Sequence, residues 1–150
     1  MQMTVSPIIL VAIVAGILAL VAIGIAFRMR TAAKHSPIGI AVAILPALLM
    51  FGLFYSLSIH MHHVLGGWPS SIGEHGFPSS LVTHAHIARD YFTLIFLLSI
   101  FVWPVAFLLC LFIQRWRVCV YYLGVYALSC LVCFGSMLVA PSQFLNWWRD

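Results

Sequence analysis

The sequence predicts an all-α integral membrane protein built as a bundle of four transmembrane helices. Of its 150 residues, 64% are hydrophobic and 7% are charged, whereas a typical soluble domain has roughly 25% charged residues. A water-soluble fold of this size could not cover its surface with so few charges. Four apolar stretches also exceed the roughly 18 residues that mark a membrane-spanning helix. We therefore expect a single membrane domain over residues 1–150, in contact with the lipid bilayer.

The four apolar stretches define the expected spans. They cover about residues 7–27, 37–59, 91–113 and 118–140. Ser36 followed by Pro37 is typical of an N-cap and a first helical turn. Pro46 and Pro104 lie inside the second and third spans, where we expect each proline to kink its helix. Residues 60–90 are then an ordered loop between the second and third helices.

The basic residues predict the orientation of the bundle. The formal net charge is +4, and most of the positive residues lie in two connections. Arg28, Arg30 and Lys34 follow the first span, and Arg115 and Arg117 follow the third. By the positive-inside rule these two connections face the cytoplasm. Both termini and the loop at 60–90 then face outward from what we expect to be a bacterial inner (plasma) membrane, and the charges indicate topology, with no nucleic-acid partner.

Two rows of small residues mark close helix packing. They are Ala12, Ala15, Ala19, Ala22 and Ala26 on the first helix, with Gly39, Ala43 and Ala47 on the second. Small side chains let helix backbones approach in lipid, where no hydrophobic drive favours association. The rows predict tight packing within the bundle, or a docking seam for another membrane subunit or a second copy of the chain.

Histidines are concentrated in one part of the sequence. Six of the seven fall in residues 60–86, in the patterns H-x-H-H and H-x-H. From Leu81 the sequence can continue as a helix into the third span, and the second helix can run beyond the membrane through the first histidine group. If these helices are antiparallel neighbours, the two groups lie at similar heights. His84 and His86 point apart on a helix, so one of them faces inward, and the pattern does not decide which.

This arrangement predicts a transition-metal site. Neutral imidazoles suit copper and zinc, and two facing groups can supply three or four nitrogens. The expected metal ligands are His60, His62, His63, His84 and His86, with Asp90 and Glu74 as orienting carboxylates. Because Asp90 lies four residues after His86, it is placed to orient that ring. The leading hypothesis is a small accessory or binding protein that holds Cu or Zn at its outer face.

Other interpretations stay open. The histidines could be interface residues bonded to water and headgroups, in a purely structural subunit of a larger membrane complex. A b-type haem or quinol site would need two histidines on different helices, and a proton sensor or relay would use their titration. We expect a binding protein more than an enzyme, because no catalytic motif is present and the acids are limited to Glu74, Asp90 and Asp150. The four cysteines are expected to be apolar packing residues.

Overall fold

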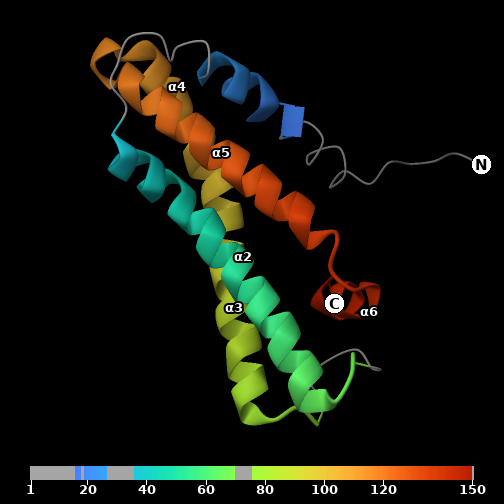
Figure 1. The fold of residues 1–150 in the computed structure, drawn as a ribbon. Coiled ribbons are helices and arrows are strands. Elements are labelled where there is room, and N and C mark those ends of the chain that lie inside the picture. The colour runs from blue at the N-terminus through green and yellow to red at the C-terminus, as the bar shows by residue number, and fades with distance from the viewer. Residues whose placement is uncertain (1–15, 18, 27–35, 70–75, 150) are drawn as a thin grey trace, which may run out of the picture. The chain divides into compact units, whose positions relative to one another are not determined.

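The computed structural model describes residues 16–17, 19–26, 36–69 and 76–149, and over these ranges it is helical without a β-strand (Figure 1). The predicted all-α class is therefore confirmed. The elements are α2 (Pro37–Leu65), α3 (Ser79–Leu97), the π-helix η2 (Leu98–Val102), α4 (Trp103–Phe112), the short 3-10 helix η3 (Gln114–Trp116), α5 (Arg117–Met137) and α6 (Ser142–Arg149).

Among the residues that the structure describes, three helical stretches are long and apolar enough to cross a membrane. They are Pro37–Leu65, Ser79–Phe112 and Gln114–Met137. In their most apolar parts between 22% and 33% of the residues are buried within the protein, so most of the apolar surface is open to contact with lipid. About half of the first predicted span, 7–27, lies outside the described residues, and the described part is helical at every position. The four-helix count therefore stays a prediction.

The connection between α2 and α3 is shorter than the loop predicted at residues 60–90. Helix α2 begins at Pro37, as expected, and the N–H of Ile40 donates to the carbonyl of Ser36. It then continues to Leu65, while α3 already begins at Ser79. Both helices thus extend past their predicted spans, as the sequence suggested, and the histidine groups lie on helices.

Proline affects the third membrane-length helix through a change of helix type. Pro104 lies in the first turn of α4, directly after η2. A proline lacks an N–H, and its ring crowds the carbonyl four residues earlier, which belongs to Ile100 in η2. A π-helical turn is wider than an α-helical one and accommodates such a disruption. The structure thus has a π-helix directly before Pro104, where the sequence predicted a kink.

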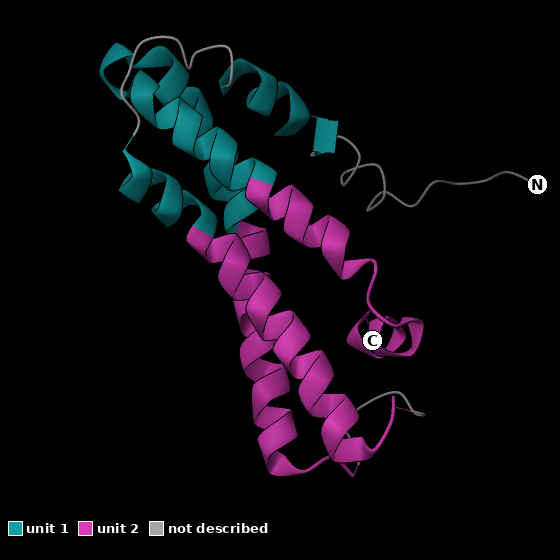
Figure 2. Cartoon of the chain, in the orientation of Figure 1, with its two compact units in different colours: residues 1–44, 98–128 teal, residues 45–97, 129–150 magenta. Residues whose placement is uncertain are grey.

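The chain falls into two compact units, shown in different colours in Figure 2. The first combines residues 1–44 with 98–128, and the second combines residues 45–97 with 129–150. In the first unit a small core contains Ala22, Ala26, Phe107, Cys110 and Val120. The indole N–H of Trp103 donates to the carbonyl of Leu123 at 3.0 Å, which ties α4 to α5.

Small residues allow close approaches to α5 in this first unit. A Cβ placed on Gly124 would lie 2.5 Å from the Cβ of Ala26, and one placed on Gly39 would lie 2.5 Å from the Tyr122 ring. The Tyr122 hydroxyl accepts a hydrogen bond from the backbone N–H of Ser36 at 2.9 Å. Two members of the predicted small-residue rows, Ala26 and Gly39, thus pack against α5. Ala22 and Ala47 are also buried, while Ala12 and Ala15 lie outside the described residues.

In the second unit, the short helix α6 packs through aromatic side chains. Its Phe144 and Trp147 are buried, whereas Ser142, Gln143 and Asn146 are exposed, so the helix is amphipathic. Phe144 lies edge-on to Phe54 of α2, with ring centroids 5.1 Å apart. The guanidinium carbon of Arg89 in α3 lies 4.9 Å from the centre of the Trp147 ring. Trp147 is therefore a packing residue of this unit.

Candidate functional site

Helices α2 and α3 are antiparallel neighbours in the second unit, as Figure 1 shows. Near one end of the pair, the hydroxyl of Tyr91 donates to the carbonyl of Pro46 at 3.3 Å. Further along, His60 on α2 faces His84 on α3. The sequence placed the two histidine groups at similar heights on the condition that the helices are neighbours, and the structure meets this condition.

The closest contact between the histidine groups joins His60 and His84. Their Nδ1 atoms are 3.0 Å apart, and the rings are tilted by 35° with centroids 5.3 Å apart. Both side chains are half-buried. One imidazole nitrogen from each helix therefore points at the same small region of space, and each remains within reach of water.

A hydrogen-bonded chain fixes the orientation of the His84 ring. The hydroxyl of Ser56 donates to the carbonyl of Leu53 at 3.1 Å, so its oxygen can accept a second hydrogen bond. The Nε2 of His84 lies 3.1 Å from that oxygen. If Nε2 carries the proton and donates to Ser56, the neutral His84 ring has its lone pair on Nδ1, the atom that faces His60. This polarity follows from the Ser56 donation, and it leaves Nδ1 of His84 able to accept a proton or bind a metal.

Helical periodicity explains why His84, and not His86, faces α2. Leu81, Ala85 and Ala88 are all buried. Leu81 and Ala88 lie at the i−3 and i+4 positions from His84, on the same face of α3, and Ala85 lies next to it in the chain. His86 lies away from this face and is exposed. The two alanines let α3 approach α2 closely, so the small residues around His84 were the sequence signal for its direction.

The structure brings together two of the five predicted metal ligands. His62 packs against Trp68, with ring centroids 4.8 Å apart, and His62, His63 and His86 are all exposed. Within the described parts of the chain, no group of three or more His, Cys, Asp or Glu side chains is close enough to hold a metal ion. The five-histidine cluster expected from the sequence is thus reduced here to the pair His60 and His84.

The structure describes one of the two predicted orienting carboxylates. Asp90 is exposed on α3, and Glu74 lies outside the described residues. The group bonded to the second nitrogen of His84 is instead the hydroxyl of Ser56. Sequence reasoning missed Ser56, although it lies one helical turn before His60 and therefore on the same face of α2.

No family model or curated protein matches the sequence, and no solved structure matches the fold.

Proposed function

We propose that the chain is a small membrane protein that binds a transition metal, Cu or Zn, through His60 and His84 at the outer face of the bilayer. The single observation that supports this is the convergence of the two Nδ1 atoms, which lie 3.0 Å apart on adjacent helices. The positive residues after the first and third predicted spans favour an orientation with both termini outside. The protein then acts as an accessory or binding protein on that side of the membrane.

The distance between the nitrogens suits two ligands of one ion. Zinc binds imidazole nitrogen at about 2.0–2.1 Å, so two nitrogens on a tetrahedral ion are about 3.3 Å apart. The observed separation needs to widen by only a few tenths of an ångström to reach that value. Ser56 supplies the outer hydrogen bond that histidine ligands of metals usually make. Water, a rotated His63 or a second copy of the chain would complete the coordination.

A haem fits the same pair less well. Two axial histidines lie on opposite sides of the iron, and bonds of about 2 Å place their nitrogens about 4 Å apart. The porphyrin must also lie between the two rings. The direct 3.0 Å contact leaves no such gap, so an ion bound at the side of the pair is the better fit.

The test is the metal content of the purified protein. The chain is prepared in mild detergent without a polyhistidine tag and incubated separately with Zn²⁺ and Cu²⁺. After desalting, the metal per chain is measured for the wild type, His84→Ala and His86→Ala. We expect about one ion per chain in the wild type if the site lies within one chain, or about half if two copies share it. Electron paramagnetic resonance of the copper form should show coupling to nitrogen.

The two variants separate the proposal from its alternatives. His86→Ala is the matched control, because His86 lies two residues away on the same helix and is exposed. It should retain metal, and His84→Ala should not. Equal retention by both variants, or no retained metal in the wild type, would overturn the proposal and favour a purely structural subunit.

A further inference from the structure

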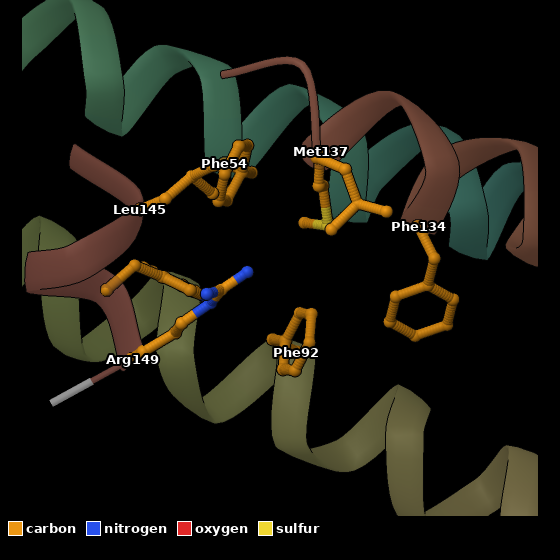
Figure 3. Close-up of a pocket in the computed structure, with 8 residues that line it drawn as sticks. Phe54, Phe92, Phe134, Met137, Leu145 and Arg149 are labelled. Atoms are coloured by element: carbon orange, nitrogen blue, oxygen red, sulfur yellow. The ribbon is translucent and has the colours of Figure 1, made fainter. Parts of the chain in front are cut away.

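A cavity of about 330 Å³ lies in the second unit, away from the histidine pair (Figure 3). Its lining comes from α2, α3, the end of α5 with the residue after it, and α6. The lining residues are Phe54, Phe92, Phe134, Met137, Leu138, Leu145, Trp148 and Arg149. Seven of these eight are apolar or aromatic, and Arg149 alone among them is charged.

Aromatic contacts give this cavity a defined wall. Trp148 lies edge-on to Phe54 and to Phe92, with ring centroids 5.3 Å and 5.7 Å apart. Phe92 also lies edge-on to Phe134 at 5.6 Å. Edge-to-face pairs of this kind are a favourable aromatic geometry. Because the three contacts join four helices, the cavity is held open by the packing of the unit itself.

The size and lining of the cavity select an apolar ligand. A cavity of about 150 Å³ with an apolar lining stays dry and accepts one benzene molecule. A volume of about 330 Å³ therefore has room for roughly a dozen carbon atoms. That is one acyl chain segment and not two. Water would find few hydrogen-bonding partners among these side chains.

Arg149 gives the ligand a second requirement. Its side chain is exposed, and in Figure 3 it extends from α6 toward the space between Phe54 and Phe92. A guanidinium group binds phosphate through paired hydrogen bonds. A ligand that satisfies both features has an acyl chain joined to an anionic head.

We propose that this cavity binds one acyl chain of an anionic phospholipid, whose phosphate is held by Arg149. Anionic phospholipids have this chemistry, and lipids constantly surround helices of membrane-spanning length. The acyl chain fills the apolar cavity, and the guanidinium group of Arg149 binds the negatively charged phosphate. This site is independent of the metal proposed at His60 and His84.

The experiment is native mass spectrometry of the full chain, released from nanodiscs that contain equal amounts of phosphatidylglycerol and phosphatidylcholine with matched acyl chains. We expect one retained lipid per chain, with phosphatidylglycerol preferred. Arg149→Gln should reduce this preference by about three- to five-fold, the loss expected for one exposed ion pair. Arg117→Gln is the matched control, since Arg117 is an exposed arginine at the start of α5, and it should retain the preference.

A second variant tests the cavity itself. Leu145→Trp places a large side chain at a lining position and should reduce retention of both lipids. Equal retention of the two lipids by the wild type would overturn the proposal, as would an unchanged preference in Arg149→Gln. Unchanged lipid retention in Leu145→Trp would show that the acyl chain binds elsewhere. Selective retention of a free fatty acid would overturn the assignment of a phospholipid as the occupant.

Discussion

Replacing Gly124 by alanine should destabilise the protein, although alanine is normally the better helix former. Gly124 is buried on α5, and an added Cβ there would lie 2.5 Å from the Cβ of Ala26. Carbon atoms in contact normally lie about 3.5–4.0 Å apart. The two helices would therefore have to separate by about 1 Å or more along this line, because neither Cβ can move without its backbone.

The magnitude follows from two opposing effects. Overpacking of a well-packed site typically costs about 1–3 kcal/mol, whereas glycine to alanine in a helix interior gains up to about 1 kcal/mol. We expect a net loss of about 1–2 kcal/mol in the free energy of unfolding. Gly135, also on α5, has no atom within 4 Å of an added Cβ. Gly135→Ala should therefore stabilise by about 0.5–1 kcal/mol.

The assay is unfolding of the protein in mixed micelles with increasing sodium dodecyl sulfate, followed by circular dichroism. Gly124→Ala is compared with Gly135→Ala, and then combined with Ala26→Gly. Removing the Cβ of Ala26 should relieve the overlap, so the double variant should be no less stable than Ala26→Gly alone. The reasoning is refuted if Gly124→Ala is as stable as Gly135→Ala, or if the two changes at positions 26 and 124 are simply additive.

Two further predictions concern the site and its side of the membrane. Ser56→Ala should weaken metal binding by about ten- to hundred-fold, the usual effect of losing an outer hydrogen bond to a histidine ligand. Ser80→Ala, on the exposed surface of α3, should leave the affinity unchanged. Competition with a chromogenic chelator measures both affinities, and equal affinities would show that Ser56 is not part of the site. In a chain whose native cysteines are replaced by serine, His63→Cys should react with an impermeant maleimide from outside and Gln114→Cys from inside only. Labelling of both from one side, or the reverse pattern, would contradict the proposed orientation.

Much of the fold could be predicted from the sequence because lipid imposes simple rules on it. The apolar lengths gave the three described membrane-length helices, and Pro37 marked the start of α2. Helix α6 was missed, since eight residues are too few for a length criterion and its amphipathic pattern is short. The π-helix at Leu98–Val102 was also missed, because a proline predicts only that some irregularity occurs.

The candidate site was less predictable because it depends on contacts between helices. Histidine spacing identified the two groups, but it could not choose between His84 and His86. That choice depended on Ala85 and Ala88, which are buried against a neighbour that the sequence alone could not establish. Ser56 and the cavity near Arg149 were missed for the same reason, since their partners lie far away in the chain.

The π-helix has a consequence for the phase of the third membrane-length helix. Before the π-helix, the buried positions Ala88 and Ile95 are seven residues apart. Two further steps of seven residues lead to positions 102 and 109, which a regular α-helix would therefore bury. Val102 and Leu109 are instead 54% and 47% exposed, and the buried residues of α4 are Phe107 and Cys110. The repeat is displaced by one residue, which corresponds to about 100° of rotation about the helix axis. An in-frame deletion of a single residue within Leu98–Val102 would remove the residue that the π-helix absorbs and leave Phe107 and Cys110 facing the core. Conversion of the same segment into a regular α-helix without a deletion would instead turn these side chains by about 100° away from the core that they now fill.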